Sequence, residues 1–167
     1  FFTATPKNSN IPDMGMNGKT FGKVIAQVPA PDLIAKGYII PPKVKAVKYP
    51  VGHFQNQEEI DKKVILDALN NEKHMDKVLV TAKSTANIRN LITKTDFQAI
   101  CHTMKYNVMW ITAKYGAIIN GKKVNRETFF NLMNKWGSDD TKKFLLFHHS
   151  ILSEGMNVSG LTAAILM

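Results

Sequence analysis

The sequence predicts an α/β protein whose mostly parallel sheet is covered by helices on both faces. Short apolar runs alternate along the chain with segments whose apolar residues recur at helical spacing. Two of these runs, 77–82 and 143–149, contain continuous apolar stretches, as expected for strands that are buried on both faces. Strands that alternate with helices favour parallel pairing, because each helix can return the chain across the sheet.

The N-terminal part of the chain predicts short elements joined by loops. Residues 7–20 are rich in Asn, Gly, Pro and Met and predict a loop, and residues 22–29 predict a short strand. Residues 31–37 predict a helical turn, because Pro31 suits its start and Gly37 suits its end.

Residues 41–50 alternate apolar side chains with lysines between prolines. This alternation predicts a half-exposed strand, with Val44, Ala46 and Val47 facing inward. Proline is tolerated in a strand mainly at its start or at the edge of a sheet.

The clearest helix is predicted over residues 57–72, where acidic residues occupy the first turn and apolar residues share one face. The apolar residues are Ile60, Val64, Ile65 and Leu69. Further helices are predicted at 85–91 and 126–136, and further strands at 77–82, 108–112, 143–149 and 162–167. Gly137 follows the helix at 126–136 and is expected to end it.

Composition is that of an ordinary globular protein. Apolar residues make up 44% of the 167 residues and charged residues 21%, so a packed core is expected. No apolar run approaches the roughly 20 residues that span a bilayer, and no secretory signal is visible. Cys101 is the only cysteine, which fits a reducing compartment. We therefore expect a cytoplasmic protein that is not secreted, or a nucleoplasmic or viral-factory protein if its source is a virus.

The net charge of +9 makes the chain a candidate phosphate binder, because lysines displace counterions from a nucleic-acid backbone. A solvated basic surface or a compositional bias explains the charge equally simply. Arg89 and Arg126 are the only arginines among 22 basic residues, and this scarcity argues against dense reading of base edges.

Ligands of parallel sheets gather where the strands end, so the loops after residues 82, 112 and 149 are the most informative. In the first, Ser84 or Thr85 can cap the following helix or help to bind a phosphate. The second loop, 112–127, predicts a polar, solvated connection, and its lysines could contact a phosphate. These lysines are Lys114, Lys122 and Lys123.

The third loop contains the sharpest signal. A buried strand leads into a polar elbow, Ser153-Glu154-Gly155, followed by Asn157 and a second strand that is also expected to be buried. Glycine permits a close backbone approach, while the hydroxyl and the amide can bond a phosphate or a ribose. This segment resembles motif V of superfamily-two (DEAD-like) helicases and translocases.

Three other segments resemble the same family, in the same order along the chain. Residues 1–7, FFTATPK, resemble motif III; residues 21–44 resemble the entry into the second lobe; and residues 77–91, KVLVTAKSTANIRNL, resemble motif IV. The resemblance implies a RecA-like three-layer domain, incomplete at both ends. Residues 1–20 would close the first lobe and begin the linker, and residues 21–167 would form the second lobe, cut before motif VI.

The resemblance implies a parent motor that uses ATP and Mg²⁺ and binds nucleic acid, with DNA favoured over RNA. Its first lobe and its motif VI region would be further partners of this chain. The family's pattern assigns interlobe coupling to Thr3 and Thr5, and nucleotide contact to Gly155 and Asn157. It assigns nucleic-acid contact to Thr81, Lys83, Ser84, Thr85, Ser153 and Glu154. No residue of this chain is expected to be catalytic or to bind a metal.

Several features depart from the family pattern. Asn157 is neutral where a carboxylate is usual, and Ser159-Gly160 replace the proline that follows it. The chain contains neither the phosphate loop G-x-x-x-x-G-K-[ST] nor the acidic run D-E-x-H/D. A nucleic-acid-binding α/β module without a motor therefore stays open. A small enzyme using Ser153, Glu154 or His149 is a weaker alternative, because no nucleophile with a base and an orienting group is visible.

We expect the chain by itself not to hydrolyse ATP, because hydrolysis needs a phosphate cradle, Mg²⁺ and a charge-stabilising arginine together. A malachite-green assay on the purified chain, with and without single-stranded DNA, measures this. Phosphate release that nucleic acid stimulates would contradict the expectation.

Overall fold

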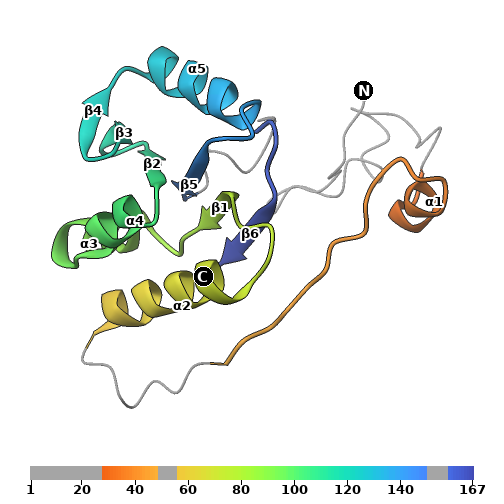
Figure 1. The fold of residues 1–167 in the computed structure, drawn as a ribbon, viewed down its shortest axis with the longest axis horizontal. Helices are drawn as coiled ribbons and strands as arrows, with labels where there is room; N and C mark the ends of the chain where they lie inside the picture. Colours follow the sequence, from red (N-terminus) through yellow and green to blue (C-terminus); the bar gives the residue numbers. More distant parts are fainter. Residues whose placement is uncertain (1–27, 49–55, 150–157) are drawn as a thin grey trace, which may run out of the picture. The chain divides into compact units, whose positions relative to one another are not determined.

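The computed structural model describes residues 28–48, 56–149 and 158–167. The chain divides into two compact units, residues 1–47 and 48–167. The only element of the first unit within the described residues is the short helix α1 (Ala30–Ala35). All the described strands and the other described helices belong to the second unit (Figure 1).

Helix α1 ends as its sequence predicts. Gly37 adopts a φ of +74°, its N–H bonds the carbonyl of Ile34 at 2.9 Å, and the N–H of Tyr38 bonds that of Leu33 at 2.9 Å. This pair of bonds is the Schellman arrangement, which satisfies the last carbonyls of a helix. The predicted strand at 22–29 lies outside the described residues except for its last two, which have no regular structure.

The strand predicted at 41–50 is wrong over the residues that are described. Residues 41–48 form no regular structure, and Val44 and Val47 are 88% and 56% exposed. Ala46 is also exposed. Alternation alone does not make a strand, since the ladder needs a partner, and the prolines that open this segment have no N–H to donate.

The second unit confirms the predicted α/β class. Its sheet has six strands in the order β4-β3-β2-β5-β1-β6, in which β6, β1, β5 and β2 are parallel. Strands β3 and β4 continue the sheet as an antiparallel hairpin. The strands are β1 (Lys77–Thr81), β2 (Tyr106–Thr112), β3 (Gly116–Ile119), β4 (Lys122–Val124), β5 (Lys143–His148) and β6 (Ala163–Leu166).

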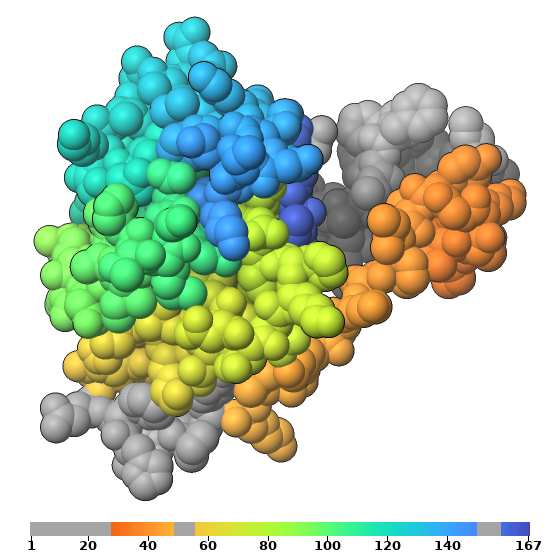
Figure 2. Space-filling view, viewed as in Figure 1, coloured from red at the N-terminus to blue at the C-terminus, as the bar shows by residue number. Residues whose placement is uncertain are grey.

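Helices cover the sheet on both sides, which gives the three layers expected of a RecA-like fold. Helix α5 (Arg126–Gly137) lies on one face, and α2 (Gln57–Asn71), α3 (Thr85–Lys94) and α4 (Phe97–Thr103) lie on the other (Figure 1). In the same view, the atoms of α2, α3 and α4 adjoin one another (Figure 2). Each of α2, α3 and α5 begins at a polar side chain that caps it: Asn56, Ser84 and Asn125.

Strand β5 divides the interior into two cores. Leu145 and Phe147 pack into the cluster beneath α2, α3 and α4, whereas Phe144 and Leu146 pack into the cluster beneath α5. All four side chains are 0% exposed. Burial of each contributes roughly 2 kcal/mol, and the alternation places two on each face of the sheet. Substitutions in β5 therefore affect both cores.

Three parts of the second unit differ from the sequence prediction. The polar loop predicted after residue 112 contains the β3–β4 hairpin. Its lysines make the sequence look polar, although Ala117 and Ile119 point into the core. Helix α4 was not predicted, because it is only seven residues long. Strand β6 was expected to be buried, but it lies at the edge of the sheet and Leu166 is 82% exposed.

The end of α5 and the start of β6 meet around Lys77. The Lys77 ammonium is buried and donates to the carbonyl of Gly137 at 2.7 Å, with Asp140 at 3.4 Å. A Cβ on Gly160 would lie 2.1 Å from that same carbonyl oxygen, and Gly160 has a φ of +69°. Glycine is therefore required here for both conformation and space.

We expect Gly160→Ala to destabilise the fold more than Gly116→Ala, which is a matched control. Gly116 also has a positive φ of +77°, but its added Cβ would meet only Lys123 Cε at 3.5 Å. Backbone strain should therefore lower the free energy of unfolding of the control by about 1 kcal/mol. Gly160→Ala should lower it by at least about 2 kcal/mol more, because the backbone around the added Cβ must move. Urea unfolding measures both, and equal losses would contradict the close packing at Gly160.

Candidate nucleic-acid interface

The carboxyl ends of the parallel strands are level across the sheet. In the strand register, Thr81 of β1 lies beside His148 of β5, and His148 lies beside Ile111 of β2. The segments that follow these strands therefore start at one edge. They include the loop within the motif IV-like segment 77–91 and the chain that leads toward the motif V-like elbow, so both leave the sheet at neighbouring strand ends.

Hydrogen bonds tie the exits of β1 and β5. Thr81 Oγ1 and His148 Nε2 share a hydrogen bond of 3.0 Å. The next residues repeat the link, since His149 Nδ1 donates to the carbonyl of Ala82 at 3.0 Å. The N–H of Ala82 donates to the carbonyl of His148, also at 3.0 Å. These bonds fix where both following loops leave the sheet.

Burial favours the neutral form of the His148 imidazole. Its side chain is only 4% exposed, and burial, helped by the nearby charge of His149, lowers its pKa. Its Nδ1 has no hydrogen-bond partner among the residues the structure describes. The imidazole therefore positions Thr81 without adding positive charge to the edge.

The loop after β1 resolves the alternative between Ser84 and Thr85. Ser84 is the N-cap of α3, because its Oγ accepts the N–H of Asn87 at 3.1 Å. Its hydroxyl donates to Asn87 Oδ1, and Thr85 is the first helical residue. Lys83 precedes the cap and is exposed. Within this loop Lys83 is thus the cation that can meet an incoming phosphate.

The buried acid Asp61 lies behind this loop and was not predicted. It is 6% exposed on α2, and Gln57 Nε2 donates to its Oδ1 at 2.7 Å. Burial raises the pKa of Asp61, while the hydrogen bond from Gln57, the charge of Lys83 and the amide of Asn87 oppose that rise. The only sequence signal was a carboxylate directly after the apolar Ile60.

Most of the net charge belongs to one stretch. Residues 77–126 contain nine basic residues and a single acidic one, Asp96, and so carry +8 of the chain's +9. This stretch supplies β1, the loop after it, α3, and everything from α4 to the start of α5. The charge is therefore concentrated on the part of the fold that includes the ends of β1 and β2.

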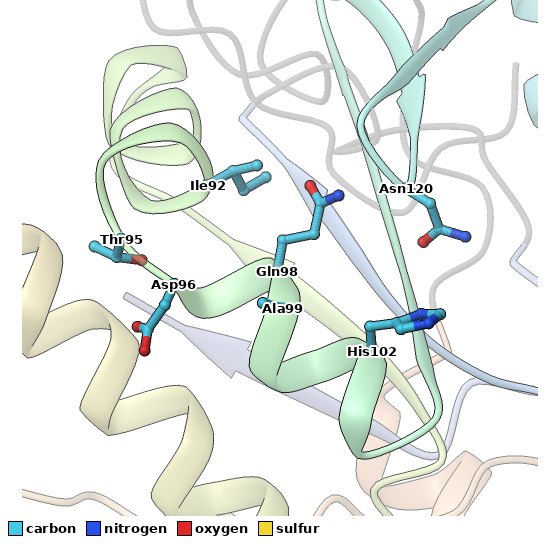
Figure 3. Close-up of a pocket in the computed structure, with 7 residues that line it drawn as sticks. All are labelled: Ile92, Thr95, Asp96, Gln98, Ala99, His102 and Asn120. Carbon is cyan, nitrogen blue, oxygen red and sulfur yellow. The ribbon is translucent and has the colours of Figure 1, made fainter.

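The described part of the second unit includes a larger and a smaller cavity. The larger, about 560 Å³, is open and lined by α3, α4 and the β3–β4 turn, with Asn120 and His102 at one side (Figure 3). Asn120 bonds the N–H of Val108 near the start of β2, so this cavity lies toward the opposite edge from the strand ends. The smaller, about 230 Å³, lies at the end of β2 and includes Lys123 and Arg126.

The remaining predicted site residues lie outside the described residues: Thr3, Thr5, Ser153, Glu154, Gly155 and Asn157. Within residues 28–48, 56–149 and 158–167, no group of three or more His, Cys, Asp or Glu side chains could hold a metal ion. No helix in these ranges has the length and hydrophobicity needed to cross a membrane. Comparison with protein families, curated proteins and solved structures finds no match to this chain.

We expect Asp61→Asn to stabilise the fold at neutral pH. A carboxyl whose pKa is raised by folding favours the folded state below its ordinary pKa, and that contribution is lost as the pH rises through the folded pKa. Asparagine keeps the oxygen that accepts from Gln57 but cannot ionise. The variant should melt a few degrees higher at about pH 7, and the difference should shrink toward about pH 3.5.

Thermal unfolding followed by circular dichroism measures this effect. Asp67→Asn is the control, because Asp67 lies on the same helix but pairs with Lys63 at the surface, with 34% of its side chain exposed. If Asp61→Asn melts at a lower temperature than the wild type at neutral pH, the carboxylate of Asp61 stabilises the fold and the prediction is wrong.

Proposed function

We propose that this chain is the second RecA-like lobe of an ATP-dependent helicase or translocase and that it grips the backbone of single-stranded DNA at the carboxyl edge of its sheet. The observation that supports this most is the level alignment of Thr81 and His148. Two segments far apart in the sequence resemble nucleic-acid-contacting motifs of one family, and in both the chain leaves its strand at this edge.

Charge supports the same proposal. Lys83 is exposed at the edge, and the basic stretch 77–126 provides the positive field that phosphates require. Point charges of this kind grip the backbone and do not read base edges, since direct readout uses planar, bidentate contacts. The grip should therefore be nearly independent of sequence, as a motor that moves along a strand requires.

The site residues keep the roles that the resemblance assigns. Lys83 would neutralise a phosphate, and the hydroxyls of Thr81 and Thr85 would bond its oxygens. The Ser84 hydroxyl would join them by exchanging its bond to Asn87 Oδ1 for one to the phosphate. Ser153 and Glu154 would contact the same strand, and Gly155 and Asn157 the nucleotide. ATP and Mg²⁺ would be held mainly by the first lobe of the parent. A module that binds nucleic acid without a motor would share the edge and the charge.

Binding of a fluorescent single-stranded oligonucleotide, titrated at several salt concentrations, tests the proposal. We expect Kd to rise steeply with salt and Lys83→Ala to weaken binding severalfold. The variant should also lower the slope of log Kd against log salt by the contribution of about one phosphate. Lys142→Ala is the control, because it removes the same charge from an exposed residue directly before β5, at the amino end of the sheet.

Two outcomes would count against the proposal. Absence of binding at low salt would exclude both nucleic-acid functions for this chain. Equal weakening by Lys83→Ala and Lys142→Ala would mean that binding follows total charge and not the carboxyl edge.

A further inference from the structure

Two cations share one aromatic ring at the end of β2. The guanidinium of Arg89 and the ammonium of Lys114 each lie 5.5 Å from the centre of the Tyr115 ring. Arg89 comes from α3, which starts at the end of β1, whereas Lys114 and Tyr115 belong to the turn between β2 and β3. The cluster thus joins the exits of two strands that β5 separates.

The ring is a fixed support. Tyr115 is half-buried and packs edge-on against Trp110, with ring centres 5.9 Å apart, and Trp110 is only 4% exposed. Cation–π contact contributes about 0.5–1 kcal/mol for each exposed cation, so the ring holds both side chains close to it. Both cations themselves are exposed.

Within the described residues, the two positive charges have no acidic partner. Among the described residues, neither Arg89 nor Lys114 forms an ion pair, although Lys62, Lys63, Lys77, Lys94 and Lys143 each do. Like charges held on one ring repel each other, and a bound anion would relieve that repulsion. Exposure on the outer side leaves room for such an anion.

We propose that Arg89, Tyr115 and Lys114 form a clamp that binds a further backbone phosphate of the single-stranded DNA. This proposal rests on the proposed function, because the clamp would bind the same DNA strand that Lys83 contacts at the end of β1. One intervening strand separates β1 from β2, which corresponds to about 10 Å. A few nucleotides span that distance, within the roughly 4–16 nucleotides that small single-strand-binding domains cover.

None of the family motifs identified in the sequence includes the clamp as a whole. Arg89 lies within the segment resembling motif IV but has no assigned role there, and Lys114 and Tyr115 lie between the motifs. The arginine suits a phosphate particularly well, because its planar group offers two parallel donors while the lysine supplies a point charge.

The double variant Arg89→Gln/Lys114→Gln tests the clamp. We expect it to weaken single-stranded DNA binding roughly tenfold at low salt and to lower the slope of log Kd against log salt by about 0.7, the value for one phosphate on a single strand. Lys63→Gln/Lys142→Gln is the control, because it removes two exposed charges away from the clamp. Arg89→Lys alone, which keeps the charge but loses the two parallel donors, should keep the salt dependence of the wild type and bind with an affinity between those of the wild type and the double variant.

A second probe, inorganic tripolyphosphate, separates this inference from the proposed function. Calorimetric titration should show that the wild-type chain binds tripolyphosphate and that the double variant binds it at least fivefold more weakly. If the wild type binds DNA and the double variant binds DNA and tripolyphosphate as the wild type does, the clamp is wrong and the proposed function stands. If the chain binds no DNA but loses tripolyphosphate binding in the double variant, the cations form an anion site and the proposed function fails.

Discussion

The fold depends on the complete burial of β5. Its four central side chains face two different cores and are wholly excluded from solvent, so β5 must lie in the middle of the sheet with a helical layer on each side. Strands β2 and β1 lie on either side of β5 and run parallel to it. This pairing requires long connections across the sheet, and α5 leads into β5 while the segment before β6 leads out of it. The same pairing sets the ends of β1, β5 and β2 level. The shape of the candidate interface is therefore a consequence of how the core is packed.

Much of this architecture could be predicted from local sequence. The fold class and the order of these elements were predicted correctly, because each shows an uninterrupted apolar pattern. The elements are the apolar runs at 77–82 and 143–149 and the periodic helices at 57–72 and 126–136. The failures have physical reasons. Residues 41–50 had strand alternation but no partner, and the β3–β4 hairpin concealed two inward residues among lysines and glycines. Pairing between segments is not visible in the composition of either one.

The candidate site divides in the same way. Ser84 was foreseeable as a cap because capping is a local interaction, and Lys83 follows directly from its place after a strand. Asp61 and the clamp were not foreseeable, because each depends on contacts between elements that are distant in the sequence. Asp61 lies behind a loop that begins some twenty residues later, and Arg89 meets Tyr115 across the end of the sheet.

Two electrostatic features of this edge do not help the chain to fold. The desolvated carboxylate of Asp61 lowers the free energy of unfolding, and so do the two cations that repel each other on Tyr115. Neutralising these charges would make the fold more stable. Elsewhere in the described second unit, several acids and bases form ion pairs, as Lys62 does with Glu59 and Asp96. Unfavourable charges that cluster where strands end are the pattern expected of a surface that meets a charged ligand. The position of these charges, and not their number, is what argues for a binding edge.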